Sequence, residues 1–378
     1  MNNTSRIWAI LLMIILAFNM VTTNGNISEE KNVTIMPKKN YKAWQVNPNG
    51  LTSSHSSQEK LLYFARYAIL APSGHNTQPW LLTPWGDSLI LSINPSHYLS
   101  GDGSGLLSVE PYISLGTFIE TFTQAARGFG YEVNVRLFPK KEQVALFTIK
   151  DTCNPEPALL DAITARVSNR HPFKTDAINP NFIKKLTNNT LLGVAATPVT
   201  SRADIDFIKE QSGFAIASIM SQQPYRDELS TWVRVNHTRR HDGMPGFTHG
   251  FGNVVSLLSK QAIKKGLSPG KQVKKAMSLI DKSGALIIIR GTEDTKEAFI
   301  NAGRYYARTC IAATEAGFAS SVLAASTIDP TTREAVKQHF KLTDRPIIVL
   351  RIGTATVPGR HGPRWTLESV TTDPIPVK

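Results

Sequence analysis

Cysteine and acidic residues are both scarce in this chain of 378 residues. Its two cysteines, Cys153 and Cys310, can form at most one bridge, which excludes a disulfide framework. Cys310 lies in an apolar stretch of small residues, which favours a buried thiol over a bridge.

Only 29 Asp and Glu accompany 42 Lys and Arg, so the net charge of +13 favours an anionic partner. The lysine-rich stretch 260–275 has no interleaved aromatic residues for base stacking, so we expect a solvated basic face and no nucleic-acid partner.

Long apolar runs are missing except near the N-terminus. Residues 7–21 are apolar apart from Asn19, follow Arg6 and lead into small residues near Gly25. This run is short for a bilayer span, so residues 1–25 are predicted to be a signal peptide, with an uncleaved membrane anchor as the alternative. The protein is therefore expected to be exported and to contact a membrane only if the segment is retained. The polar stretch 26–57 lacks helical periodicity and is predicted to be a flexible tether.

Complete metal, hydrolase and dinucleotide motifs are also missing. His237 and His241 have the spacing of a metal pair, but no Cys or Glu completes a ligand set, so no metal site is predicted. The loop Gly101–Gly105 lacks the spacing of a nucleophile elbow. The segment that begins at Gly250 matches a dinucleotide fingerprint only in part, because no strand precedes it and no closing glycine follows. Hydrolase and Rossmann-type functions are therefore disfavoured.

The most informative motif that is present is the decapeptide between Ala71 and Trp80, with the sequence APSGHNTQPW. Its two prolines and its glycine end the preceding helical run, so a sharp turn is predicted between a helix and a strand. Ser73, Asn76 and Gln78 place uncharged hydrogen-bonding groups on that turn, which suits a planar polar heterocycle. An ordinary structural loop is the alternative. Gln78 and Trp80 are expected to have structural roles.

Two segments of the chain match each other at a constant offset. Small and aromatic residues after Gly116 recur after Gly303, and both segments end at a glycine, Gly130 or Gly317, followed by an aromatic residue and a β-rich run. These features predict two central helices at an interface between two α+β halves that meet near residue 155. A chance match between two alanine-rich helices is the alternative.

Cationic residues cluster twice in the second half. Arg166, Ser168 and Arg170 alternate, so an extended backbone would turn them toward one ligand, and an anion suits them. Arg360 and Arg364 lie on a Gly/Pro-rich loop that suits a phosphate. A solvated surface is the alternative for both clusters.

Taken together and in this order, the motifs resemble the FMN-dependent nitroreductase superfamily, and within it the single-chain, internally duplicated Acg-like branch. The resemblance extends from about Leu61 to Arg364. It implies an α+β, nitroreductase-like fold in which two pseudo-equivalent halves, 58–155 and 156–378, mimic the family homodimer, so that the chain is a monomer. It also implies a single FMN site with NAD(P)H as a possible electron donor. The residues expected to bind the cofactor are Pro72, Ser73, Gly74, Asn76, Arg166, Ser168, Arg170, Ala325, Ser326, Arg360 and Arg364.

In that site, the first-half residues would contact the ribityl chain and the ring edge. Arg166, Ser168, Arg364 and Arg360 would hold the phosphate, and Arg170 would approach the pyrimidine side. The segment 232–252 resembles the lid-like insertion of the family. Two functions follow from the resemblance. One is an oxidoreductase that passes electrons through FMN to a small acceptor such as a nitroaromatic or a quinone. The other is a flavin-binding or flavin-sequestering protein whose lid blocks turnover.

Overall fold

The computed structural model describes residues 39–99, 108–188, 191, 193–267 and 269–373. The predicted signal peptide, residues 26–38 of the predicted tether and the loop Gly101–Gly105 lie outside these residues. None of the helices in the described ranges is both long enough and apolar enough to cross a bilayer.

The first half is a four-stranded antiparallel sheet covered by helices. Its elements are α2 (Ser57–Ala68), β1 (Trp80–Trp85), β2 (Ser88–Ile93), α3 (Glu110–Gly128), β3 (Tyr131–Leu137) and β4 (Gln143–Thr152). Helix α2 begins at a capping box formed by Ser56 and Glu59, and the chain stops being helical before Pro72. The strand order is β1-β2-β4-β3.

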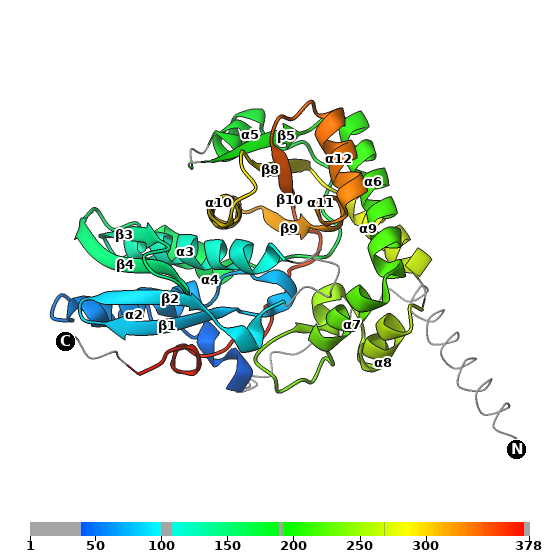
Figure 1. Cartoon of the computed structure of the whole chain (residues 1–378). Coiled ribbons are helices and arrows are strands. Elements are labelled where there is room, and N and C mark those ends of the chain that lie inside the picture. Colours follow the sequence, from blue (N-terminus) through cyan, green and yellow to red (C-terminus); the bar gives the residue numbers. More distant parts are fainter. Residues whose placement is uncertain (1–38, 100–107, 189–190, 192, 268, 374–378) are drawn as a thin grey trace, which may run out of the picture.

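The second half repeats this arrangement with a long insertion. Its elements are α5 (Pro180–Thr187), β5 (Val194–Val199), β8 (Ala285–Gly291), α10 (Lys296–Glu315), β9 (Ala319–Leu323), α11 (Ala325–Ile328), α12 (Pro330–His339) and β10 (Arg345–Gly353). The strand order β5-β8-β10-β9 is that of the first half, and every pairing is again antiparallel. The predicted α+β class with two equivalent halves is confirmed at the level of topology (Figure 1).

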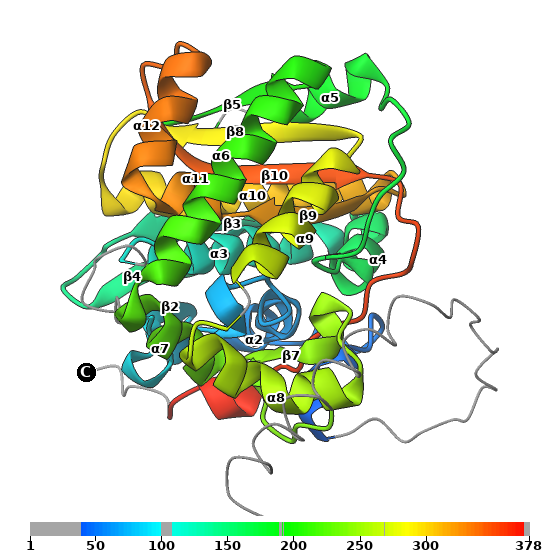
Figure 2. The ribbon, with the colours of Figure 1, turned by 90° about the vertical axis from the view of Figure 1, so that its right-hand side faces the viewer.

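The insertion lies between β5 and β8, where the first half has only a tight turn between β1 and β2. It contains α6 (Arg202–Ser221), α7 (Gln223–Trp232), β6 (Val233–Arg234), β7 (Met244–Pro245), η4 (Gly246–His249), α8 (Asn253–Lys264) and α9 (Pro269–Asp281). Figure 2 shows α6 and α9 lying across the second sheet, while α7 and α8 extend beyond it toward the first half.

Helices α3 and α10 form the interface between the halves, as the matching segments predict. A Cβ atom added at Gly116 would lie 2.0 Å from the carbonyl oxygen of Ile300, and one at Gly303 would lie 2.0 Å from that of Ile113. The two backbones are therefore in direct contact at the two matching glycines. Both repeats end as predicted, because Gly130 and Gly317 have positive φ values of 83° and 79°.

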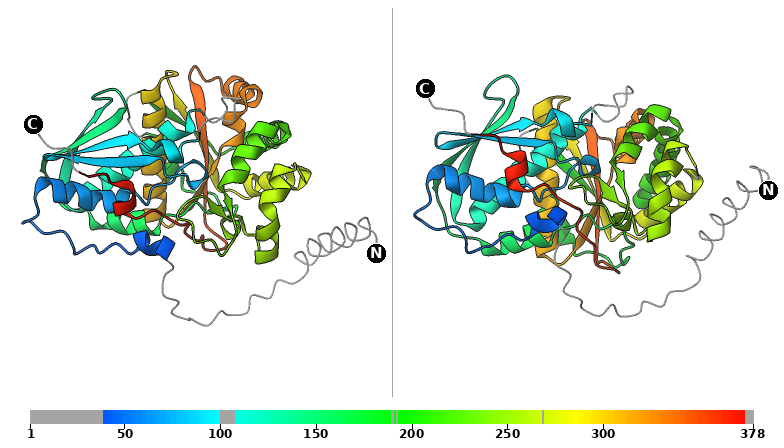
Figure 3. Two further views of the ribbon diagram at one scale, coloured as in Figure 1. Left: turned by 60° about the horizontal axis from the view of Figure 1, so that its bottom comes forward. Right: turned by 90° about the horizontal axis from the view of Figure 1, so that it is seen from below.

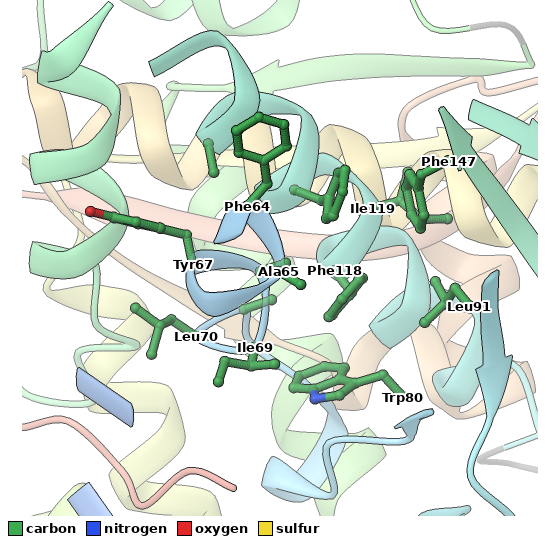
Figure 4. Packing of buried hydrophobic residues seen from close by; sticks show 14 of the residues in the cluster. Phe64, Ala65, Tyr67, Ile69, Leu70, Trp80, Leu91, Phe118, Ile119 and Phe147 are labelled. Atoms are coloured by element: carbon green, nitrogen blue, oxygen red, sulfur yellow. The ribbon is translucent and has the colours of Figure 1, made fainter. Parts of the chain in front are cut away.

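The core of the first half is aromatic (Figure 4). Trp80 is fully buried, with its ring centre 5.3 Å from that of Phe118, and Phe64 and Phe122 meet edge to face. Trp80 fixes the start of β1 immediately after the decapeptide, which agrees with its expected structural role. In the second half, Cys310 is a buried thiol whose sulfur accepts a hydrogen bond from Ser320 Oγ at 3.2 Å. Burial raises the pKa of this thiol to about 11.

Three segments depart from the predicted division. Residues 39–57 are not a flexible tether as predicted: η1 (Lys39–Trp44) is folded, and Asn40 within it is buried. Helix α4 (Pro157–Ala165) was assigned to the second half, but its Leu160 and Ile163 pack in the core of the first. The C-terminal segment also returns to the first half, where Thr371 pairs with Leu82 of β1 and η5 (Leu367–Val370) covers the core (Figure 3).

Candidate functional site

The decapeptide forms a tightly held turn after α2. His75, Asn76 and Gln78 all have positive φ values, 47°, 57° and 56°, which side chains larger than glycine rarely adopt. Hydrogen bonds hold this backbone: Ser73 Oγ accepts from the Gln78 amide at 3.0 Å, and the Gly74 amide donates to Ser114 Oγ at 3.0 Å. Left-handed backbone at adjacent positions of this kind is concentrated at functional sites.

The lid-like segment 232–252 is bound directly to this turn. The Gly243 amide donates to the Asn76 carbonyl oxygen at 3.1 Å, and Asn76 Nδ2 donates to the Gly243 carbonyl oxygen at 2.9 Å. Gln78 is fully buried and joins two segments: its Nε2 donates to the His241 carbonyl oxygen at 2.7 Å, and its Oε1 accepts from the Trp365 amide at 2.9 Å. Gln78 therefore has the structural role predicted for it.

A cavity lies where the decapeptide, the chain after α4, the lid-like segment and the C-terminal segment meet. It is lined by Trp44, Pro72, Ser73, Asn76, Arg166, Val167, Ser168, Arg170, Gly243, Met244, Thr248, Arg360, His361, Gly362 and Arg364. Eight of the eleven predicted site residues are among them. The structure therefore brings together groups from both halves that are up to 292 positions apart, counted from Pro72 to Arg364.

Three predicted residues do not line this cavity. Gly74 instead packs against the side chain of Glu110, whose Oε2 lies 3.0 Å from a Cβ placed at Gly74. Ala325 and Ser326 open α11, where Ala325 packs against an apolar cluster of the insertion. The side chain of Ser326 is fully buried, and its hydroxyl has no hydrogen-bond partner within the described part of the chain.

The cavity is strongly cationic. Across the described ranges, Arg166, Arg170, Arg360 and Arg364 form no ion pair with a carboxylate. Burial and the charge of Arg166 lower the pKa of Arg364 to about 9. Buried cations that repel one another are costly unless a counter-charge joins them, so this cavity is suited to an anion.

Backbone carbonyl groups hold two of these arginines in place. Arg364 donates from Nη2 to the carbonyl oxygens of Leu70 and Ala71 at 3.3 and 3.1 Å, and from Nη1 to Asn76 Oδ1 at 2.5 Å. Arg166 Nη2 donates to Leu70 at 2.9 Å. The Nε atom of Arg364 is buried and has no partner among the described residues. One buried donor of this arginine is therefore left without a partner inside the described part of the protein.

More positive charge surrounds Arg170. Burial and then the Arg170 charge lower the pKa of His75, to about 4, and the pKa values of Lys275 and His249. Tyr306 also lies here, and its phenol forms a hydrogen bond with Ser168. Burial raises the pKa of this phenol, so it stays neutral and adds no negative charge. The field around Arg170 is thus positive on several sides, which extends the anion-binding character beyond the four arginines.

Sequence reasoning missed two aromatic residues of the site. Trp44 and His361 stack with ring centres 3.8 Å apart, and Trp44 Nε1 donates to the Gly362 carbonyl oxygen at 2.9 Å. Burial, then the charges of Arg166 and Arg364, lower the pKa of His361 to about 4. Trp44 was overlooked because it lies in the stretch predicted to be a tether. The pair of aromatic residues Tyr41 and Trp44 in an otherwise polar sequence was the available signal.

Asn40 closes the outer side of the site and supports a first prediction. Its Nδ2 donates to the carbonyl oxygens of Thr238 and Arg240 at 3.1 and 2.9 Å, and its own carbonyl oxygen accepts from the Arg364 amide at 3.0 Å. Asn40→Ala is expected to lower the free energy of unfolding by about 1–3 kcal/mol, because it leaves buried acceptors unpaired. Urea unfolding would measure this. Asn49→Ala, at an exposed position, should change little, and equal effects of the two substitutions would contradict the assignment.

The described residues contain no cluster of three or more His, Cys, Asp or Glu side chains suited to a metal ion. His241, one of the spaced histidines, instead donates a hydrogen bond from Nδ1 to the Arg364 carbonyl oxygen, 2.9 Å away, and stacks on Trp365.

Comparisons with known proteins place this geometry in context. No protein-family model matches the chain. Two Mycobacterium tuberculosis proteins, from strains H37Rv and CDC 1551, each named "Putative NAD(P)H nitroreductase", are 25% identical over 319 residues, which is 82% of this chain and 89% of theirs.

Solved structures are more distantly similar. The FMN-dependent nitroreductase NfnB of Mycobacterium smegmatis in complex with NADPH matches 57% of this chain and 97% of its own, with 14% identity and a TM-score of 0.37. A nitroreductase with bound FMN from Desulfitobacterium hafniense matches 54% and 93%, with 11% identity and a TM-score of 0.37. The sequence similarity to the two mycobacterial proteins, which covers most of both chains, supports the assignment of this chain to the nitroreductase superfamily.

Proposed function

We propose that the protein is an FMN-dependent oxidoreductase of the nitroreductase type. The observation that carries this proposal is the cavity between the two halves, where four arginines converge with the polar decapeptide and have no carboxylate partner among the described residues. A phosphate ester supplies the missing negative charge, and a flat polar ring suits the hydrogen-bonding groups of the turn. The mycobacterial relatives named as NAD(P)H nitroreductases support the oxidoreductase class.

The residues of the cavity divide between the two ends of such a cofactor. Arg166, Ser168, Arg360 and Arg364 would bind the phosphate, and the buried Nε of Arg364 is a donor without a partner among the described residues. Arg170 would lie toward the pyrimidine side of the ring, where a positive charge stabilises the reduced anionic form. The decapeptide would orient the ring edge and the ribityl chain. When bound, FMN supplies the hydride and electron transfer chemistry that no side chain of this site provides.

The site would thus accept electrons from NAD(P)H and pass them to a small acceptor, such as a nitroaromatic or a quinone. The NAD(P)H in the names of the mycobacterial relatives supports this donor. The apolar N-terminal run supports export, and the two equivalent halves within one chain support a monomer.

One observation favours a second function. Gly243 of the lid-like segment is hydrogen-bonded through both its amide and its carbonyl group to Asn76. A lid held in this way over the decapeptide would cover a bound ring and exclude a donor. The protein would then bind or sequester flavin without nicotinamide-dependent turnover.

The absorption spectrum of the purified protein tests both functions. Flavin absorbance, or its appearance on titration with FMN, is expected for either one. Rapid mixing with NADH or NADPH should bleach the flavin band if the protein is an oxidoreductase, whereas bleaching by dithionite alone would support sequestration. A protein that binds no FMN would contradict both proposals.

Substitutions at the phosphate end give a second test of the site. Arg360 is exposed, and its guanidinium carbon lies 4.4 Å from the ring centre of Phe247, so Arg360→Ala should fold normally. We expect Arg360→Ala to weaken FMN binding by about 1–2 kcal/mol, and the buried Arg166→Ala by about 2 kcal/mol or more, because each loses a charge-assisted contact. Isothermal titration would measure the affinities. Arg239→Ala, which removes an exposed charge outside the cavity, is the control. Equal affinities in all three variants would place the phosphate elsewhere.

A further inference from the structure

Helix α8 buries polar side chains and exposes apolar ones, which is the reverse of an ordinary surface helix. Its most buried side chains are Ser256 and Ser259, whereas Val254, Leu257 and Leu258 are 61%, 68% and 41% exposed. These three residues have the i, i+3, i+4 spacing of one helical face. Leu267, just after the helix, is 54% exposed. Four of the eight large apolar residues exposed in the described ranges therefore lie on this one helix and the turn that follows it.

Positive charge surrounds the same apolar face. Between Gly252 and Ile280 the sequence has six lysines and no acidic residue. Lys260, Lys264 and Lys265 lie on α8 and the turn after it and are exposed, whereas Lys271, Lys274 and Lys275 lie on α9, where Lys275 Nζ donates to the His249 carbonyl oxygen. Two carboxylates lie close by on α7, where Asp227 and Glu228 line the groove between α7 and α8. Glu228 there accepts a hydrogen bond from Trp232 Nε1 at 2.8 Å.

The helix lies at the periphery of the molecule. Figures 1 and 2 show α8 at the lower edge, away from both sheets. It packs mainly on α7, β6 and η4, and Ile263 turns toward the apolar cluster under α7. A helix in this position can present its outer face to a flat surface without disturbing either half.

We propose that the outer face of α8, formed by Val254, Leu257, Leu258 and Leu267 with the flanking lysines, docks on an anionic lipid membrane. The apolar side chains of this face suit the acyl chains of a bilayer, and the lysines beside them suit its acidic headgroups. A second copy of the chain would bring the same lysines face to face, so like charges oppose self-association through this surface. Nucleic acid would leave the leucines exposed to water, with no aromatic side chain to stack a base.

Docking of this kind would orient the candidate site. Thr248 of η4 lines the cavity, and α8 begins five positions later at Asn253. The lid side of the cavity would then lie close to the bilayer surface, within reach of apolar molecules dissolved in it.

Site-specific spin labelling of the full chain tests the proposal, because a label on α8 reports whether this helix itself enters the bilayer. Attachment of the chain through its N-terminal apolar run would not by itself immerse the label. A nitroxide would be attached to Leu257→Cys in a Cys153→Ser background, since Cys310 is buried. A label at Lys141→Cys, exposed in the turn between β3 and β4, is the control. On phosphatidylcholine vesicles that contain phosphatidylglycerol, the label at position 257 should gain collisions with oxygen and lose contact with a water-soluble nickel complex. The label at 141 should stay in water.

The charge requirement is tested in the same system. Lys264→Glu with Lys265→Glu should lower the immersed fraction of the label at position 257 at least tenfold, and pure phosphatidylcholine should support little immersion. The proposal is overturned if the position-257 label stays in water on every vesicle, or if immersion does not depend on lipid charge. Spin–spin broadening of this label in lipid-free solution would assign the face to a second copy of the chain and would overturn it as well.

Discussion

Gly303→Ala is expected to abolish folding or to lower the free energy of unfolding by more than about 3 kcal/mol. The added methyl group would lie 2.0 Å from the carbonyl oxygen of Ile113, well inside any van der Waals contact. The atom it meets belongs to the backbone of α3 and cannot rotate away, so α3 and α10 must separate. Because these helices join the two halves, separation would disturb both cores and the cavity between them. Urea unfolding monitored by circular dichroism would measure the loss.

Gly116→Ala should have a similar effect, since its added Cβ would meet the backbone of Ile300 at the same distance. The matched control is Gly270→Ala in α9, where a Cβ has no neighbour within 4 Å. That substitution should be neutral or raise stability by up to about 1 kcal/mol, because alanine loses less conformational entropy than glycine in a helix. Near-native stability of Gly303→Ala would show that the two backbones are not in close contact.

These glycines also illustrate how much of the fold the sequence predicted. The matching positions, 187 residues apart, gave both central helices, because small residues leave a regular pattern when two helices must approach closely. The β-rich runs predicted after Gly130 are strands β3 and β4, and the run predicted after Gly317 is β10, because apolar and alternating runs of this kind leave a pattern in the sequence. The C-terminal segment could not be assigned to the first half. It is held by Thr371 and Thr372 at the edge of β1, and isolated polar contacts have no period.

In the candidate site, too, features with a local sequence pattern were predicted and contacts between distant residues were not. Arg166, Ser168 and Arg170 line one cavity as their alternation predicts, and the decapeptide faces them. The alternation was readable because an extended backbone repeats every two residues. Trp44 and His361 were missed because their contact joins residues 317 positions apart, counted from 44 to 361, and no local pattern records such a stack. Ala325 and Ser326 are predicted from the resemblance alone; Ala325 packs against the apolar cluster of the insertion, and Ser326 is buried outside the lining of the cavity.

The second large effect expected is a loss of stability in weak acid that arises at the site itself. Burial, reinforced by neighbouring arginines, lowers the pKa values of His75 and His361 to about 4, from 6.5 in the unfolded chain. Above pH 6.5 both histidines are neutral in both states and have no effect. As the pH falls from 6.5 toward 4, the two histidines become protonated in the unfolded chain but stay neutral in the folded protein. The free energy of unfolding therefore decreases. Each histidine should cost about 2 kcal/mol at pH 4.5, or roughly 4 kcal/mol together.

Non-titrating replacements isolate this effect from other acid-labile groups. His361→Phe keeps a flat ring to stack on Trp44, and His75→Asn suits the left-handed backbone at that position. The double variant should lose about 4 kcal/mol less than the unmodified protein between pH 7.5 and 4.5 in urea unfolding, whereas the exposed His237→Gln should lose as much as the unmodified protein. A phosphate-bearing ligand in the cavity would offset the arginine charges and make the histidines easier to protonate. The acid loss should therefore shrink when FMN is present, and an unchanged pH profile in the double variant would show that these histidines are not held neutral by the site.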